Sequence, residues 1–186
     1  MALTHTPICN FGESAHDFHL ADPHGRSWSL ADCRGELGTL VMFICNHCPY
    51  VQAIREDLVQ DVRELARHGI KAVAIMPNDY GAYPEDSPEN MRRIADQLGF
   101  TFPYLIDETQ EVARAYGAVC TPDFFGYDAG LGLQYRGRLD ATSPGRPAPP
   151  GSKRELLDAM IEVARTGRGP REQTPSMGCS IKWRRQ

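Results

Sequence analysis

Two cysteines separated by two residues are the feature of this sequence most suited to chemistry. The segment reads Cys45-Asn46-His47-Cys48 and follows a short apolar run, Gly38–Ile44. If a helix begins at Pro49, the Cys-x-x-Cys spacing lets the two sulfurs meet across its first turn. The partial positive charge of the helix N-terminus then stabilises a thiolate. The spacing therefore predicts reversible exchange between a dithiol and a disulfide.

The two cysteines are expected to differ in role. Cys45 is predicted to be the more exposed and hence the attacking thiol, and Cys48, inside the first helical turn, the resolving one. His47 between them would stabilise a thiolate if protonated, and Asn46 completes the supporting dipeptide. Two inert buried cysteines remain an alternative. No metal is predicted, because zinc prefers four ligands and the sequence has no second Cys-x-x-Cys or histidine pair at ligand spacing.

Composition narrows the remaining function classes. The chain has 186 residues, 41% of them hydrophobic and 24% charged, with a net charge of −4. No basic field recruits nucleic acid, and no apolar run approaches the roughly 18 residues of a membrane helix. The N-terminal segment has neither the basic nor the apolar region of a secretory signal. We therefore expect a cytoplasmic protein without nucleic-acid or membrane partners, whose six cysteines are kept reduced.

Apolar periodicity predicts the elements that position this pair. Gly38–Ile44 and Lys71–Met76 are typical of buried parallel strands, and Pro49–His68 of an amphipathic helix. The other expected elements are two short strands within 17–32, helix Pro88–Leu98, strand Phe102–Ile106, helix Thr109–Tyr116, strands Asp123–Asp128 and Leu133–Leu139, and helix Ser152–Thr166 with a Ser152/Glu155 capping box.

This order predicts a single α/β domain over residues 1–186, with a central mixed sheet flanked by helices on both faces. Residues 1–34 are expected to form an N-terminal extension with a hairpin. Residues 167–186 are expected to form an irregular tail. The oligomeric state is not predicted.

A second motif, Cys120-Thr121-Pro122, supports a family resemblance. Together with the segment FICNHCPYV, it resembles the thioredoxin-like superfamily in its AhpC/TSA and TlpA-like branch. The N-terminal stretch GESAHDFHLADPHGRSWSLADCRG resembles the opening of peroxiredoxins and TlpA-like proteins, and TPSMGCSIKW the ending of uncharacterised thioredoxin-like proteins. The resemblance implies a thioredoxin-like fold, a cis Pro122, and a Thr121 backbone that pairs with an incoming substrate chain. It supports Cys45 as attacking and Cys48 as resolving, and no cofactor is predicted.

Three positions depart from the thioredoxin pattern. Thr39 stands where thioredoxins carry a buried aspartate that assists proton transfer. The Asn46-His47 dipeptide replaces Gly-Pro and resembles the Pro-His dipeptide of the oxidising DsbA group. That likeness implies a disulfide that is more oxidising than the disulfide of thioredoxin, whose reduction potential is roughly −270 mV. Cys120 replaces an apolar residue, and we interpret it as a packing cysteine, with a third redox thiol as the alternative.

Three functions compete. The first is a thiol-disulfide oxidoreductase acting on protein or small-molecule disulfides and thiols. The second is a peroxiredoxin-like thiol peroxidase acting on peroxides, with Cys48 or Cys45 peroxidatic. Cys48-Pro49 resembles that family's Cys-Pro step, but Val41 and Cys45 depart from its Pro-x-x-x-Thr-x-x-Cys signature. The third is a non-catalytic metal carrier or binding module.

Several other residues are given structural interpretations. Cys179 is interpreted as a packing contact of the tail, with a second resolving thiol as the alternative. Cys9 and Cys33 are interpreted as structural. The segment Asp79–Ser87, which carries acids and aromatics, is interpreted as a solvated loop.

Overall fold

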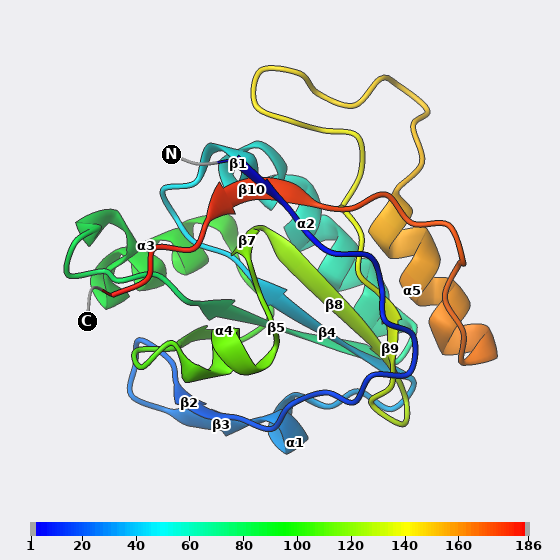
Figure 1. The fold of residues 1–186 in the computed structure, drawn as a ribbon, viewed down its shortest axis with the longest axis horizontal. Coiled ribbons are helices and arrows are strands. Elements are labelled where there is room, and N and C mark those ends of the chain that lie inside the picture. Colours follow the sequence, from blue (N-terminus) through cyan, green and yellow to red (C-terminus); the bar gives the residue numbers. More distant parts are fainter. Residues whose placement is uncertain (1–2, 185–186) are drawn as a thin grey trace.

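The computed structural model describes residues 3–184 and contains two sheets (Figure 1). The central sheet has the strand order β3-β2-β6-β5-β4-β8-β9. Its strands are β2 His19–Ala21, β3 Ser27–Ser29, β4 Gly38–Phe43, β5 Ile70–Met76, β6 Tyr104–Ile106, β8 Asp123–Asp128 and β9 Leu133–Tyr135. The smaller sheet has the order β1-β10-β7, from β1 Leu3–His5, β7 Cys120–Thr121 and β10 Met177–Ser180.

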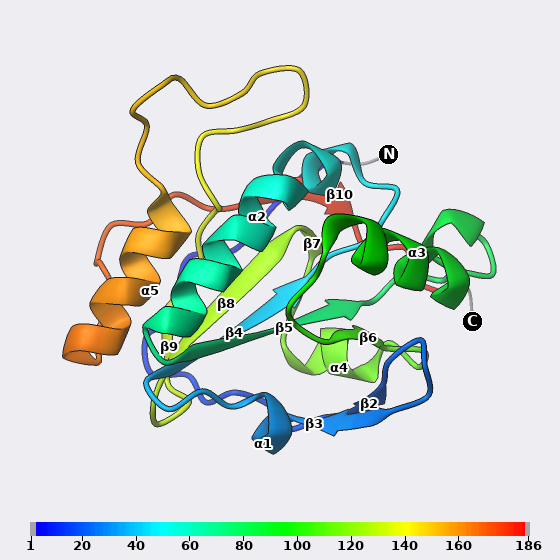
Figure 2. The same cartoon turned by 180° about the vertical axis from the view of Figure 1, so that it is seen from behind.

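Helices cover both faces of the central sheet (Figure 2). One face carries α2 (Pro49–Arg67), α3 (Pro88–Leu98) and α5 (Glu155–Thr166), and the other carries α1 (Leu30–Cys33) and α4 (Glu111–Ala115). Successive side chains of β4 alternate between the two cores that result, because strand residues point to opposite faces. The predicted α/β fold with a mixed sheet is confirmed.

Strand β4 lies in the middle of the sheet and leads directly to the cysteine pair. It pairs in parallel with β5 and antiparallel with β8, and all six of its residues are buried. The chain then turns into α2, whose first residue is Pro49. A buried central strand therefore fixes one side of the turn that holds the thiols, and a 19-residue helix fixes the other.

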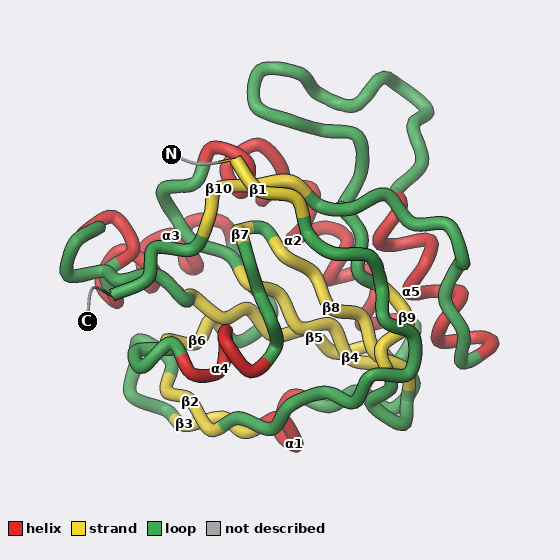
Figure 3. The backbone as a smooth tube through the Cα atoms, in the orientation of Figure 1, coloured by secondary structure: helices red, strands yellow, loops and turns green. Residues whose placement is uncertain are grey.

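One sequence expectation about the ends of the chain needs correction. The tail 167–186 is not irregular throughout, because β10 runs antiparallel between β1 and β7 (Figure 3). The predicted N-terminal hairpin, in contrast, is present as β2 and β3, and it extends the central sheet because Ala21 pairs with Ile106. Both segments find backbone partners that lie far away in the sequence.

The predicted capping box of the last helix is also wrong. Helix α5 begins at Glu155, and no side chain caps it. Ser152 is instead held in a turn in which its N–H donates to the Pro149 carbonyl. Within residues 3–184, none of the helices combines the length and apolar character needed to span a bilayer.

Candidate active site

The two cysteines lie together against β7. The Sγ of Cys45 is 3.2 Å from Thr121 Oγ1, and the Sγ of Cys48 is 3.0 Å from the Thr121 carbonyl oxygen. The Thr121–Pro122 peptide bond is cis. Cys48 is the N-cap of α2 rather than part of its first turn. Both cysteines are buried, with exposed fractions of 1% and 0%, so exposure does not distinguish an attacking thiol.

Electrostatic surroundings differ between the two thiols. The neighbouring Cys45 thiol, with Cys179 and the Val51 backbone, lowers the pKa of Cys48 to about 5 against the effect of burial. Burial raises the pKa of Cys45 well above its usual value, and the Cys48 sulfur and the Asp86 charge add to this rise. These directions favour Cys48 as the thiolate of the reduced pair, whereas the sequence expectation gave the attacking role to Cys45.

A buried aspartate binds the histidine of the motif. His47 Nδ1 lies 2.6 Å from Asp86 Oδ2, and Asn78 Nδ2 donates to the same oxygen at 2.9 Å. The other oxygen accepts the backbone N–H groups of Asn46 and His47 at 2.7 and 3.2 Å. Asp86 thus has four donors and is completely buried.

This contact favours the charged form of both groups. The hydrogen bond that His47 donates to Asp86 raises the pKa of His47 against the opposing effect of burial. Burial alone would raise the pKa of Asp86, but the hydrogen bonds from His47 and Asn78 outweigh it and hold that pKa below its usual value. When protonated, His47 therefore places a positive charge near Cys48, as the sequence suggested, and Asp86 partly neutralises it.

Sequence reasoning missed the residues that support the motif. The interpretation of Asp79–Ser87 as a solvated loop is wrong for Asp86, which lies in the short 3-10 turn Pro84–Asp86. Tyr83 stacks on His47 with ring centroids 5.2 Å apart. Tyr104, at the start of β6, donates from its hydroxyl to Asn46 Oδ1 at 3.1 Å. The available signal was the pair of prolines that bracket Asp86 and mark a compact turn.

Three potential metal ligands meet in this cluster. Atoms of Cys45, His47 and Asp86 lie within 4.8 Å of one another. However, His47 Nδ1 and the oxygens of Asp86 already use each other and nearby amides as hydrogen-bond partners. A metal would have to break the His47–Asp86 contact, so the arrangement fits a charged positioning pair better than a coordination site.

The cysteines that the sequence analysis interpreted as packing residues are not part of the Cys45–Cys48 pair. The Cys120 thiol is buried and turns toward the Pro122 carbonyl at 3.6 Å, and burial raises its pKa. Burial also raises the pKa of Cys9 and of Cys33 to about 11 each. Thr39 lies at the far end of β4, where its hydroxyl accepts the Gly35 N–H at 3.1 Å. These contacts agree with a packing role for the three cysteines.

The edge expected to receive a substrate chain is occupied. Strand β10 pairs with β7 so that Cys179 faces Thr121 and Ser180 faces Cys120. The expectation that the Thr121 backbone is free to pair with an incoming strand is therefore wrong in this structure. The reason is the tail itself, which folds back over the site and takes that position.

The fold and the paired thiols define a thioredoxin-like protein. The model of the AhpC/TSA family matches residues 11–139, and the chain belongs to this family. A crystal structure of an uncharacterized conserved protein from Geobacillus kaustophilus is 42% identical, with a TM-score of 0.92 over 100% of this chain and 98% of that chain.

Two relatives are named as different kinds of thiol protein, a peroxiredoxin and a thiol-disulfide oxidoreductase. The protein called "Putative peroxiredoxin Rv2521" of Mycobacterium tuberculosis is 29% identical over 124 residues, which is 67% of this chain and 74% of the relative. Thiol-disulfide oxidoreductase ResA of Geobacillus thermodenitrificans is 29% identical over 137 residues, 67% of this chain and 72% of the relative. The chain is therefore similar to both kinds of protein.

Proposed function

We propose that the chain is a thiol-disulfide oxidoreductase whose redox centre is the Cys45–Cys48 pair. The observation that carries the proposal is the burial of both thiols against Thr121 at the start of α2, with Cys45 Sγ 3.2 Å from its hydroxyl oxygen and Cys48 Sγ 3.0 Å from its carbonyl oxygen, and with the pKa of Cys48 lowered to about 5. A thiol with such a pKa is a thiolate at neutral pH, and the thiolate is the reactive form. The neighbouring thiol is within reach to close a disulfide.

The electrostatics favour Cys48 as the nucleophile. Its thiolate attacks one sulfur of a substrate disulfide, forming a mixed disulfide and releasing the first substrate thiolate. Cys45 then gives up its proton and attacks Cys48 Sγ. The second substrate sulfur leaves and takes that proton, so two electrons have passed to the substrate and the Cys45–Cys48 disulfide has formed.

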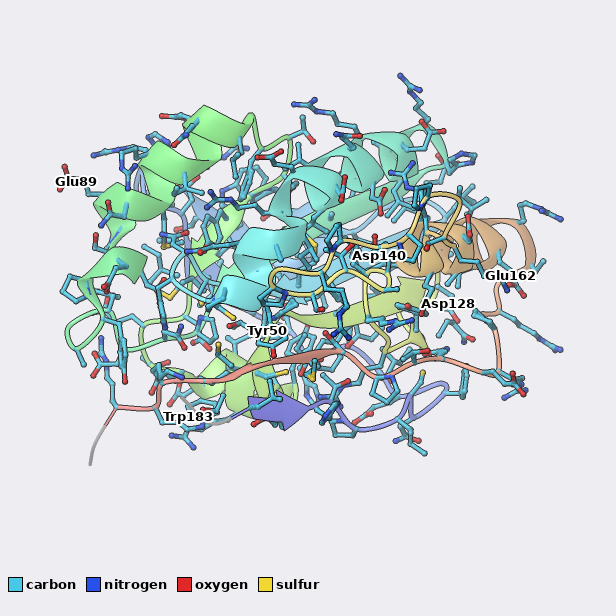
Figure 4. The ribbon with its side chains drawn as sticks, turned by 90° about the horizontal axis from the view of Figure 1, so that it is seen from above. Tyr50, Glu89, Asp128, Asp140, Glu162 and Trp183 are labelled. Atoms are coloured by element: carbon cyan, nitrogen blue, oxygen red, sulfur yellow. The ribbon has the colours of Figure 1, made fainter. Side chains whose placement is uncertain are left out.

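Substrate access differs from strand addition at Thr121, because β10 covers that edge. A cavity of about 520 Å³ has Pro122 among its lining residues. Tyr50 of the first turn of α2 and Met177 of β10 line it, and Figure 4 shows Tyr50 between that helix and the strand. We propose that a small disulfide, or an exposed disulfide on a flexible loop, reaches the pair through this cavity.

Single-cysteine variants test the proposal. With dithiothreitol as electron donor and bis(2-hydroxyethyl) disulfide as substrate, Cys48→Ser is expected to lose turnover at least 100-fold. Cys45→Ser is expected to accumulate a mixed disulfide on Cys48, visible as a mass increase. Cys120→Ser is the matched control, a buried cysteine beside the pair, and should retain activity. Mixed disulfide on Cys45 in the Cys48→Ser variant, at the wild-type rate, would reverse the roles.

A titration against glutathione buffers provides a second test. The proposed pair should titrate as one disulfide between Cys45 and Cys48, with a midpoint between about −150 and −280 mV. Failure to form this disulfide would reject the oxidoreductase. Stoichiometric zinc or copper in the protein as isolated would instead favour the metal carrier.

A thiol peroxidase is the second candidate, favoured by the low pKa of Cys48 at the Cys48-Pro49 step. The Cys48 thiolate would attack a peroxide oxygen, giving a sulfenic acid and an alcohol or water. Cys45 would then condense with it, forming the disulfide and releasing water. Hydrogen peroxide consumption in dithiothreitol separates the candidates: rapid turnover that Cys48→Ser abolishes supports the peroxidase, and no consumption above buffer rejects it.

A further inference from the structure

The tail brings a third thiol to the redox pair. Cys179 lies in β10 opposite Thr121, the residue that contacts both Cys45 and Cys48. Cys179 and Cys48 belong to the same buried cluster, and the thiol and backbone N–H of Cys179 help to lower the pKa of Cys48. An interpretation of Cys179 as a packing contact of the tail leaves this effect on the Cys48 thiol unexplained.

Hydrogen bonds of residues before and after Cys179 fix its position in the tail. On one side, the Ser176 hydroxyl donates to the Pro122 carbonyl at 2.8 Å. On the other, the Lys182 N–H donates to Asn78 Oδ1 at 2.9 Å. Asn78 also binds Asp86, so the same network holds the tail and the histidine of the motif.

Gly178 permits the close approach of the tail to this loop. A Cβ at that position would lie 2.0 Å from the Thr121 carbonyl oxygen. Only glycine therefore fits next to Cys179 without moving β10 away from β7. The tail thus presents a cysteine to Cys48 from the edge that a substrate strand would otherwise occupy.

Cys120 provides an internal comparison. It is also buried and lies on the neighbouring strand β7, directly opposite Ser180. Its thiol, however, turns to the Pro122 carbonyl rather than to Cys48. Proximity to the pair is therefore shared by two cysteines, whereas Cys179 is the one that helps to lower the pKa of Cys48.

We infer that Cys179 is a third redox thiol of the site, able to form a disulfide with Cys48 in place of Cys45. The inference rests on the proposed reactivity of the Cys45–Cys48 pair. In the exchange, the Cys179 sulfur attacks Cys48 Sγ, the Cys48–Cys179 bond forms, and the Cys45–Cys48 bond breaks. The Cys179 proton passes to the departing Cys45 sulfur, and no electrons are gained or lost overall.

The exchange gives the oxidised site two disulfide states. In one, the link joins two residues of the β4–α2 turn, and in the other it ties β10 to the start of α2. The second state frees the Cys45 thiol and fixes the tail covalently over the Thr121 edge.

Disulfide mapping in a Cys45→Ser background tests the inference. Purified protein is oxidised with diamide, alkylated, and digested without reduction. The expected product is an intramolecular Cys48–Cys179 link, retained in Cys45→Ser/Cys120→Ser and absent from Cys45→Ser/Cys179→Ser. The inference would be overturned if Cys179 stays free in the oxidised Cys45→Ser protein. Cys48 would then be reduced, linked to Cys120 or linked to a second molecule. Circular dichroism of each variant establishes that it is folded before oxidation.

The wild-type protein supplies an independent readout. Oxidised wild type, mapped in the same way, should contain both the Cys45–Cys48 and the Cys48–Cys179 links. Only the Cys45–Cys48 link, with Cys179 fully alkylated, would overturn the exchange while leaving the proposed redox pair intact. Failure of the Cys45–Cys48 pair to form any disulfide would instead reject the proposed function.

Discussion

Two ion pairs near the thiols, His47–Asp86 and Arg136–Asp123, differ in whether all their polar atoms have hydrogen-bond partners. Asp86 binds His47, and Asp123, which follows Pro122, binds Arg136 through two nitrogens at 3.1 and 3.4 Å. Arg136 also donates to the Gly117 carbonyl at 2.8 Å. His47 keeps a buried Nε2 for which no partner is found among the described residues.

The difference between the two ion pairs indicates which of them can take part in chemistry. An arginine stays protonated at any physiological pH, so Arg136 can brace the Thr121–Pro122 loop through Asp123 without changing its own charge. A histidine can change charge near neutrality, and His47 lies close enough to Cys48 for the two to affect each other. Burial of a charge therefore indicates structure in one case and chemistry in the other, and substitutions can separate the two.

The largest effect is expected from breaking the structural pair. Arg136→Met leaves Asp123 buried without a partner, which costs about 3–5 kcal/mol of unfolding free energy. Urea unfolding of the reduced protein measures this loss. The thiolate absorbance at 240 nm should still titrate near pH 5 in the folded variant, since Arg136 does not contact the pair. A large shift of that midpoint would contradict the division of roles.

A smaller loss with a chemical consequence is expected for Asp86→Asn. The variant keeps the shape but loses charged hydrogen bonds, at a cost of about 1.5–3 kcal/mol. The pKa of His47 should fall, because the hydrogen bond that His47 donates to the Asp86 carboxylate is the main cause of its rise. NMR titration of the imidazole measures this, and an unchanged His47 pKa would show that Asp86 does not control it.

The pH dependence of stability should reveal the same pair. The pKa of His47 is raised from 6.5, so its contribution is full below that value and is lost as pH rises through the folded pKa. The pKa of Asp86 is lowered from 3.8, so its contribution is full above that value and is lost as pH falls through the folded pKa.

The stability advantage of wild type over Asp86→Asn should therefore be largest between about pH 3.8 and 6.5. Above this window, His47 is charged in the folded protein but not in the unfolded chain, until the pH passes its folded pKa. Over that range the stability advantage should decline by about 1 kcal/mol for each pH unit. Unfolding in urea at several pH values measures the difference. A difference that fails to decline both below pH 3.8 and above pH 6.5 would contradict the ion pair.

The smallest effect is expected at the ring that supports His47. Tyr83→Leu removes the stacking partner but keeps an apolar side chain, at a cost of about 0.5–1.5 kcal/mol. Tyr116→Leu is the matched control, an aromatic residue packed on the opposite face of the sheet. Only the Tyr83 variant should alter the pH dependence of thiolate formation.

Residues close together in the sequence explain which structural features could be predicted correctly. The bounds Pro88–Leu98 and Asp123–Asp128 match α3 and β8, because Ser87, Pro88 and Gly99 punctuate the helix and an apolar run defines the strand. The spacing of Cys45 and Cys48 was likewise readable, since strand and helix are adjacent in the sequence. These features depend on neighbours within a few residues.

Long-range contacts explain what the sequence did not predict. Asp86 meets His47 across 39 residues, and nothing near Asp86 reveals that partner. Strand β10 is short and acquires its structure only by pairing with β1 and β7. The charge distribution between the thiols was also missed, because it depends on donors from the tail as well as on the helix.

The tail strand also has a consequence for synthesis of the protein. Cys45 and Cys48 leave the ribosome long before residues 177–180, which complete the small sheet over them. A growing chain can pair β4 with β5 and pack α2 while its two thiols lack that cover. The strand that covers the Thr121 edge and carries Cys179 is therefore the last part of the site to be synthesised.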